Sequence, residues 1–249
     1  MSRHVAPRET ASEASWPDPA IEQENLSIAR LRVGCQKTTA LYEKTIKRRK
    51  NMNQQSNFFA ILSRMKYIDR WNLMRNSRKE SLADHTLDVI FITHALVVIA
   101  NTRFEKNLDG GRAALLAAFH DAPEILTGDL PTPVKYFDPE IKQAYDNVET
   151  AAKRKMISQL PDEMQMTYES IMNSKEEGDE ILLRYVKAAD KISALIKCVE
   201  EEQSGNRDFV QAKYATLRKI DELQMPEVTC FMEQFLPGYY LTLDEQTGK

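Results

Sequence analysis

The sequence predicts an all-helical bundle. Glycine is scarce, with 8 residues in a chain of 249, and the residue types that favour helix, such as Leu, Ala, Glu and Lys, are plentiful. Apolar residues recur at helical spacing over long segments, and no segment has a convincing strand pattern. Several long helices without strands are typical of a bundle.

Residues 1–51 differ from the rest of the chain. The segment from Arg8 to Pro19 is polar and contains proline, so we expect it to be poorly ordered. The segment from Ile21 to Lys50 could form a helix, although its apolar residues are irregularly spaced. We therefore expect a poorly ordered or partly helical extension at 1–51 and one folded domain at 52–249.

The helical pattern is tighter from Met52 onward. Ser81 can cap a helix N-terminus, and Gly205 can end a helix. The expected helices run from Phe58 to Tyr67, Ser81 to Ala100, Gly111 to Asp121, Pro139 to Leu160, Asp162 to Asn173, Asp179 to Gln203, Phe209 to Met225 and Pro226 to Phe235. Pro123 should kink or restart a helix, and residues 128–133 should form a turn and an extended loop.

Charge and cysteine usage indicate which partners and compartment to expect. The formal net charge of −3 gives no general attraction to nucleic acid or anionic membrane, so we expect neither as a partner. The most apolar stretch, Val89 to Ala100, is too short to span a bilayer and should be a buried helix. Three widely spaced cysteines, Cys35, Cys198 and Cys230, argue against a disulfide framework, and no apolar leader is visible, which favours the cytoplasm.

Two of the four histidines accompany carboxylates in predicted helices. His120 is followed directly by Asp121, and Asp190 lies inside an apolar-periodic helix. Together with His85, these residues would form a mixed nitrogen and oxygen site for a divalent transition metal ion. Four ligands leave positions open for water and a phosphate oxygen. Each residue taken alone is also compatible with a structural or solvated role.

The position of His94 distinguishes it from this set. It follows His85 by nine residues, which places it about 180° around the same helix. The two side chains therefore cannot face one pocket, and we assign His94 a structural role.

Two further groups could take part in chemistry. Glu124 follows His120 by four residues and Asp121 by three, so it lies on their face if the helix continues. A carboxylate there could exchange protons with water or with a leaving oxygen. Arg70 can clamp a phosphate, and the adjacent Trp71 can stack on a sugar or base, although the pair alone is more typical of a structural role.

These motifs together resemble the HD-domain 5′-deoxynucleotidases, the YfbR-like family. The likeness runs from about Met52 to about Glu245, and its most specific part is the run Thr-Gly-Asp-Leu-Pro-Thr-Pro at 127–133. The other matching stretches are 57–66, Arg70-Trp71, 73–76, Asp84-His85, His120-Asp121-Ala122, Glu124, 134–137, 187–190, 235–237 and 243–245. The resemblance implies an HD-domain helical bundle that is cytoplasmic and forms a homodimer. The sequence departs from the family at Pro123 and adds residues 1–51.

The resemblance also implies a role for each matching site residue. Arg70 would orient the phosphate, Trp71 would border the sugar and Glu124 would be the acid or base. The implied metal ligands are His85, His120, Asp121 and Asp190. The implied substrate contacts are Arg70, Trp71, His85, Asp121, Asp129, Thr132 and Asp190.

The expected activity is hydrolysis of deoxynucleoside 5′-monophosphates to deoxynucleosides and phosphate, with one divalent ion per site such as cobalt or manganese. A wall at Trp71 would leave no room or partner for a 2′-hydroxyl. A deoxynucleoside triphosphate triphosphohydrolase is one alternative, but it should need further Lys or Arg near the metal, and none clusters near His120 in the sequence. A non-enzymatic helical binding module is a second alternative, but the intact set of expected metal ligands argues against it.

Overall fold

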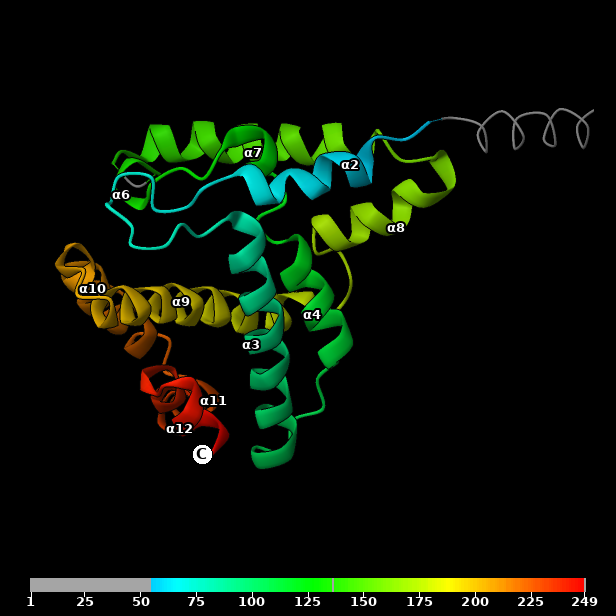
Figure 1. Cartoon of the computed structure of the whole chain (residues 1–249). Coiled ribbons are helices and arrows are strands. Elements are labelled where there is room, and N and C mark those ends of the chain that lie inside the picture. Colours follow the sequence, from blue (N-terminus) through cyan, green and yellow to red (C-terminus); the bar gives the residue numbers. More distant parts are fainter. Residues whose placement is uncertain (1–54, 136, 249) are drawn as a thin grey trace, which may run out of the picture. The chain divides into compact units, whose positions relative to one another are not determined.

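The computed structural model describes residues 55–135 and 137–248, and it confirms the all-helical fold (Figure 1). Within these residues the one extended pairing is an isolated antiparallel bridge between Asp69 and Ser81. The elements in chain order are α2 (Phe58–Leu62), η1 (Ser63–Tyr67), α3 (Leu82–Arg103), α4 (Gly110–Phe119), α5 (Glu124–Thr127), α6 (Thr132–Lys135), α7 (Pro139–Ile157), α8 (Asp162–Met172), α9 (Asp179–Gln203), η2 (Arg207–Phe209), α10 (Val210–Asp221), α11 (Pro226–Gln234), η3 (Leu236–Tyr240) and α12 (Leu243–Thr247).

Helix α3 begins where its capping residues predict. The Ser81 hydroxyl accepts a hydrogen bond from the backbone N–H of Asp84 at 3.2 Å, and the Asp84 carboxylate accepts one from the backbone N–H of Ser81 at 2.9 Å. This reciprocal capping box satisfies backbone donors that the first turn would otherwise leave unpaired. The cap therefore fixes the turn from which His85 projects.

The same helix forms the centre of the fold. It contacts α4, α9 and α11, and residues along its length from Val89 to Ala100 are buried in the core. At 22 residues α3 is longer than the apolar stretch that the sequence suggested, and by length and composition it could cross a membrane. Half of its most apolar window is buried inside the protein, as in the core helix of a bundle.

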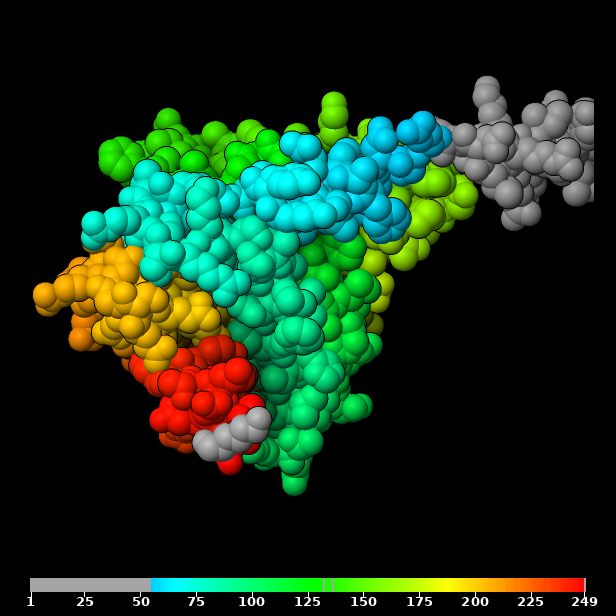
Figure 2. All heavy atoms as spheres, viewed as in Figure 1, coloured from blue at the N-terminus to red at the C-terminus, as the bar shows by residue number. Residues whose placement is uncertain are grey.

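One stripe of α3 faces outward. Leu87, Phe91 and Val98 are 52%, 64% and 44% exposed, and their spacing places them on one side of the helix. Figure 2 shows α3 at the surface of this face, beside the C-terminal elements drawn in red. The helix therefore carries an apolar strip on the side opposite its core contacts.

Two hydrophobic clusters meet along α3. One joins α3, α4, α9, α10 and α11 and includes Val89 and Ile192. The other joins α2, η1, α5, α7 and α8 to the start of α3 and includes Leu82 and Ala122. In Figure 1, α2 and α7 lie across the N-terminal end of α3, whereas α11 and α12 lie beside its other half. His85 lies between Leu82 and Val89, and so at the junction of the two clusters.

The segment after α4 differs from the prediction in two respects. Helix α4 ends at Phe119, so His120 is its C-cap and Asp121 lies in the following turn rather than in the helix. As predicted, a new helix, α5, begins after Pro123, because proline cannot donate a backbone hydrogen bond. The predicted turn is present at Gly128, with φ of 76°, but the loop expected to be extended leads into the short helix α6.

The later helices follow the predicted pattern closely. Helix α9 has the predicted bounds, and Gly205 follows it in the left-handed conformation with φ of 78°. Helix α7 ends three residues earlier than predicted. Helix α10 begins one residue later than predicted, because Phe209 belongs to η2, and ends four residues earlier, at Asp221. The C-terminal elements η3 and α12 were not predicted. The extension expected at 1–51 lies outside the described residues.

Candidate active site

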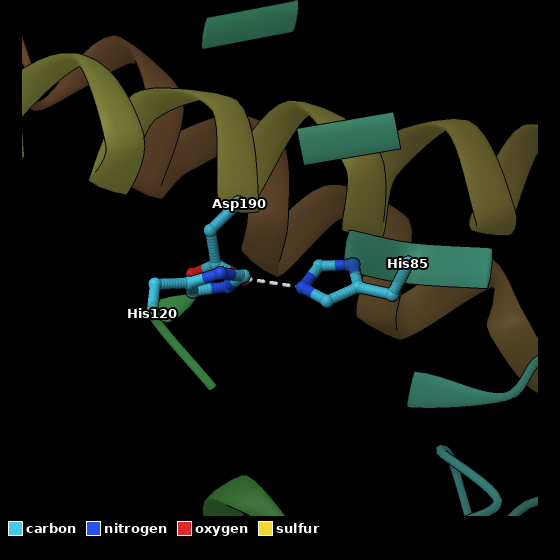
Figure 3. Close-up of side chains that lie close together, drawn as sticks. All are labelled: His85, His120 and Asp190. Atoms are coloured by element: carbon cyan, nitrogen blue, oxygen red, sulfur yellow. Dashed lines mark ion pairs between the residues drawn. The ribbon is translucent and has the colours of Figure 1, made fainter. Parts of the chain in front are cut away.

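The four predicted metal ligands come together from three parts of the chain. His85 projects from the first turns of α3, His120 and Asp121 follow α4, and Asp190 lies in the middle of α9. His85 Nε2 is 3.3 Å from Asp190 Oδ1 and 3.6 Å from Asp121 Oδ2, and His120 Nε2 is 3.0 Å from Asp121 Oδ2. Figure 3 shows the side chains of His120 and Asp190 directed toward the His85 ring. The mutual packing of α3, α4 and α9 creates this cluster.

Both imidazoles are held through their Nδ1 atoms. His85 Nδ1 lies 2.9 Å from Ser193 Oγ, and His120 Nδ1 donates to the backbone carbonyl of Ala117 at 2.7 Å. The Nε2 atoms of both rings are buried, make no well-aligned hydrogen bond among the described residues, and lie beside the carboxylates of Asp121 and Asp190. An unsatisfied buried polar atom is costly. The arrangement therefore leaves two ring nitrogens aimed at a common centre, as in metal-binding histidines whose other nitrogen is held by a second group.

The donor set fits a divalent transition metal ion. His85, His120 and Asp190 each offer a ligand atom, and these atoms lie within 4.8 Å of one another. Asp121 lies beside both imidazoles. Imidazole nitrogen combined with carboxylate oxygen suits ions of this class.

Charges within the cluster favour binding of a cation. Burial, and then the nearby Arg70, lower the pKa of His85 to about 4, so this ring is neutral. Burial disfavours a charged His120, but Asp121 and Asp190 outweigh that effect and raise its pKa to about 9. Burial also opposes ionisation of Asp121, yet His120 brings the pKa of that carboxyl to about 2. A metal ion bound here would replace the proton on His120 Nε2, because a histidine must be deprotonated at the nitrogen that binds a metal.

Glu124 lies beside this cluster although the helix does not continue into it. Its backbone N–H donates to the Asp121 carbonyl at 3.0 Å, and its side chain is buried. Burial, followed by the negative charges of Asp121 and Asp129, raises the pKa of Glu124 to about 9. Its Oε2 atom has no hydrogen-bond partner among the described residues. Glu124 is therefore a carboxylic acid that holds its proton at neutral pH.

The loop between η1 and α3 brings Arg70 close to the same site and places Trp71 next to it. The charge of Arg70 acts on Glu124, Asp129 and His85, and its Nε is buried without a partner in the described part of the chain. The Asp129 carboxylate accepts a hydrogen bond from the backbone N–H of Trp71. Of the predicted substrate contacts on these two loops, the structure brings Arg70, the Trp71 backbone and Asp129 close together. Thr132 is the first residue of α6, and its side chain lies outside the description.

The structure adds groups that the sequence did not identify. Lys191 Nζ lies 2.6 Å from Asp190 Oδ2, and the charge of Lys135 acts on Glu124. Ser193 follows Asp190 by three residues on α9, so helical spacing could have identified it as the partner of His85. No sequence pattern points to the Ala117 carbonyl, because every residue carries one.

His94 lies outside this site. Its side chain is exposed. Its ring lies against Gly110, where a side chain larger than hydrogen would place a Cβ atom 3.3 Å from His94 Cδ2. The described cluster of potential ligands does not include it.

The fold is that of HD-domain phosphohydrolases of known structure. An HD-domain phosphohydrolase from Listeria innocua has a similar structure, with a TM-score of 0.64 and 24% identity over 77% of this chain and 92% of that chain. The HD phosphohydrolase DatZ of cyanophage S-2L, solved with dA and one catalytic Zn²⁺ ion, gives a TM-score of 0.51 and 18% identity over 74% and 96% of the two chains.

The sequence comparisons specify the family. The model of the YfbR-like 5′-deoxynucleotidase family matches residues 57–239. Proteins named 5′-deoxynucleotidase from Yersinia pestis and Yersinia pseudotuberculosis are each 45% identical over 190 residues, which is 76% of this chain and 96% of theirs. The chain belongs to the YfbR-like 5′-deoxynucleotidase family. Membership confirms the expected family, the expected function class and the expected enzyme class of phosphoric monoester hydrolase.

Proposed function

We propose that this protein removes the phosphate from deoxynucleoside 5′-monophosphates in a metal-dependent reaction. The observation that carries the proposal is the convergence of two imidazole Nε2 atoms, the carboxylates of two aspartates and the buried carboxyl of Glu124 on one site. Arg70, whose charge reaches the same groups, supplies a phosphate-binding guanidinium.

The proposed cofactor is one divalent ion per site, either cobalt, manganese or another transition metal. His85, His120, Asp121 and Asp190 would hold it. When bound, such an ion activates water and offsets the negative charge of the phosphate.

The protein side chains would then manage the phosphate and one proton. Arg70 binds the phosphate and aligns phosphorus for attack by water. As the bond from the water oxygen to phosphorus forms, the bond from phosphorus to the 5′-oxygen breaks. Glu124 donates its proton to that departing oxygen, which leaves as the 5′-hydroxyl of the deoxynucleoside, and the proton that the attacking water releases returns to Glu124. The raised pKa of Glu124 supports this role, because the proton is available at neutral pH.

We propose that Trp71 borders the sugar and that Asp129 and Thr132 contact the substrate from the opposite loop. Two contacts support the assignment for Trp71. Its indole N–H donates to Glu80 Oε2 at 2.7 Å, and its ring packs against Phe209 with centroids 5.3 Å apart. A side chain held at both its polar atom and its face can act as a rigid wall.

Phosphate release from matched deoxy and ribo monophosphates tests this function. We expect the wild type to cleave the deoxy substrate at least about tenfold better, because the wall leaves the 2′-hydroxyl without room or partner. Trp71→Ala should narrow that gap, and Arg70→Ala should reduce turnover of both substrates. Equal wild-type rates on the two sugars would remove the deoxynucleotidase assignment.

A triphosphohydrolase is the second candidate, and one observation favours it. Lys191 and Lys135 add positive charge near the site from positions distant from His120 in sequence. Both lysines already pair with carboxylates, Lys191 with Asp190 and Lys135 with Glu149, and so offer less charge to additional phosphates. We therefore retain hydrolysis of monophosphates as the proposed activity. A strong preference for deoxynucleoside triphosphates in the same assay would reverse this choice.

We further propose that the protein is a cytoplasmic homodimer. The exposed apolar strip of α3, formed by Leu87, Phe91 and Val98, supports an interface on that face. Cys198 and Cys230 are free thiols, which suits a reducing compartment. Cys35 lies outside the described residues.

A further inference from the structure

Glu80 bridges the two residues that we assign to phosphate and sugar. Its side chain is 10% exposed, and its two oxygens face different partners. Oε2 accepts from the Trp71 indole N–H at 2.7 Å, and Oε1 lies 3.5 Å from Arg70 Nη1. The Glu80 backbone carbonyl also accepts from the Arg70 N–H at 2.9 Å. One carboxylate thus restrains both side chains at once.

Trp71 needs such restraint because its backbone is strained. Its φ is 60°, a left-handed conformation that is unusual for a bulky residue. Strain of this kind persists only where surrounding contacts determine the conformation. Those contacts are Glu80 at the indole nitrogen, Phe209 at the ring face and Asp129 at the backbone N–H.

Glu80 itself is anchored to the helix that carries a metal ligand. Glu201 of α9 accepts from the backbone N–H groups of Ser77 at 2.9 Å and Arg78 at 3.3 Å. Lys197, one turn earlier, donates to the Arg78 carbonyl at 2.5 Å and forms a buried ion pair with Glu201. The loop that ends in Glu80 is therefore bound to α9, which also supplies Asp190.

We propose that Glu80 is a positioning residue that sets sugar discrimination by holding the indole of Trp71, and phosphate affinity by orienting Arg70. The inference rests on the proposed function, in which Trp71 borders the sugar and Arg70 binds the phosphate. A carboxylate suits both tasks, since one oxygen can accept from the indole while the other attracts the guanidinium.

Two substitutions separate these tasks. Glu80→Gln retains a carbonyl oxygen for the indole but loses the charge that attracts Arg70. We expect it to raise KM about 5- to 20-fold for dAMP and AMP alike and to keep the ratio of their kcat/KM within about twofold of wild type. Glu80→Ala removes both interactions and should also lower that ratio by about fivefold or more. Glu200→Gln is the matched control. Glu200 and Glu80 line one cavity between the start of α3 and the end of α9, but Glu200 is an exposed carboxylate.

A second readout reports on Trp71 directly. The chain has two tryptophans, so in Trp16→Phe the measured tryptophan fluorescence comes from Trp71 alone. In that background, Glu80→Ala should increase acrylamide quenching of Trp71, whereas Glu80→Gln and Glu200→Gln should leave it close to the parent value. The helical circular dichroism signal shows that each variant is folded.

The two readouts distinguish failure of this inference from failure of the proposed function. If Glu80→Ala leaves both the substrate ratio and the quenching unchanged, or if Glu80→Gln lowers the ratio as much as alanine does, Glu80 does not position Trp71. If the wild type itself does not discriminate between the sugars, the proposed function fails. In that case the quenching comparison alone shows whether Glu80 holds the indole of Trp71 in place.

Discussion

At the scale of residues, the chemistry depends on which atom of each side chain is left free. His85 and His120 each commit Nδ1 to a protein partner, Ser193 in one case and the Ala117 carbonyl in the other. The remaining ring nitrogens meet the carboxylates of Asp121 and Asp190. Residue type alone would have allowed either nitrogen to face the site.

Removal of one proposed ligand tests the site. We expect Asp121→Ala to lower bound metal and to reduce activity by more than about 100-fold, since even partners outside the ligand set commonly contribute 10- to 100-fold. Asp121 lies next to both imidazoles, and it follows α4 rather than stabilising it, so the helical circular dichroism should persist. Metal analysis of the purified protein and a phosphate-release assay measure the two effects.

His94→Gln is the control for that experiment. Because His94 is exposed and lies outside the cluster, the variant should keep its metal content, and its stability should change by no more than about 0.5 kcal/mol. Full activity in Asp121→Ala, or loss of metal in His94→Gln, would contradict the assignment.

At the scale of elements, α9 connects the site to the loop that precedes α3. Its bounds follow from its own sequence, but its role depends on contacts with distant segments. Asp190 lies in the candidate metal site, whereas Lys197 and Glu201, further along the same helix, bind the loop backbone at Ser77 and Arg78. One helix therefore supplies Asp190 to the candidate site and also holds the loop that carries Glu80.

The buried pair on α9 should give the protein a specific acid sensitivity. Burial opposes ionisation of Glu201, but hydrogen bonds from Lys197, Ser77 and Asn206 outweigh it and lower its pKa from 4.5 to about 2. The stability that this depressed pKa provides is present above pH 4.5 and is lost as the pH falls toward 2. Glu201→Gln should therefore cost about 3–5 kcal/mol at pH 7, because Lys197 loses its buried partner, and the difference should shrink between pH 5 and pH 3.

Urea unfolding of wild type and variant across that pH range measures the effect. Glu202→Gln is a matched control on the same helix, because Glu202 pairs with Lys213 at a more exposed position and should change stability by less than about 1 kcal/mol. A difference between Glu201→Gln and wild type that stays constant with pH would show that ionised Glu201 does not supply this stability.

At the scale of the whole molecule, the site lies where two hydrophobic clusters meet. Leu82 and Ala122 belong to one cluster, and Val89 and Ala117 to the other, so His85 and His120 each fall between them. Packing of both hydrophobic clusters holds the proposed metal ligands in place. The folded region that contains them includes the whole of the match to the family model.

The domain boundary can be tested by shortening the chain. We predict that a protein beginning at Met52 folds, dimerises, binds metal and hydrolyses substrate like the full chain, because both clusters and every proposed ligand lie beyond that residue. Limited proteolysis of the full chain should cut first within residues 1–51. Light scattering, metal analysis and the activity assay provide the comparison. An insoluble or monomeric shortened protein, beside a dimeric full chain, would make residues 1–51 part of the fold.

Local sequence patterns predicted the long helices, the residue types of the candidate site and the family. Helical periodicity and caps are local properties, which is why α9 has the predicted bounds and Ser81 begins α3 as predicted. The His-Asp doublet and the loop at 127–133 were likewise identifiable from residues close together in sequence, and the family match agrees with them.

Only the tertiary structure decided how distant residues pair. The bond between Glu80 and Trp71, the contact of His85 with Ser193 and the approach of Lys191 to the site depend on packing of several elements at once. Glu124 illustrates the difference most clearly. The sequence placed it near Asp121 through a continuous helix, whereas the chain turns at Pro123 and reaches the same place by a different path. The reason is physical: local patterns report energies within a few residues, while the position of a side chain depends on every segment that packs around it.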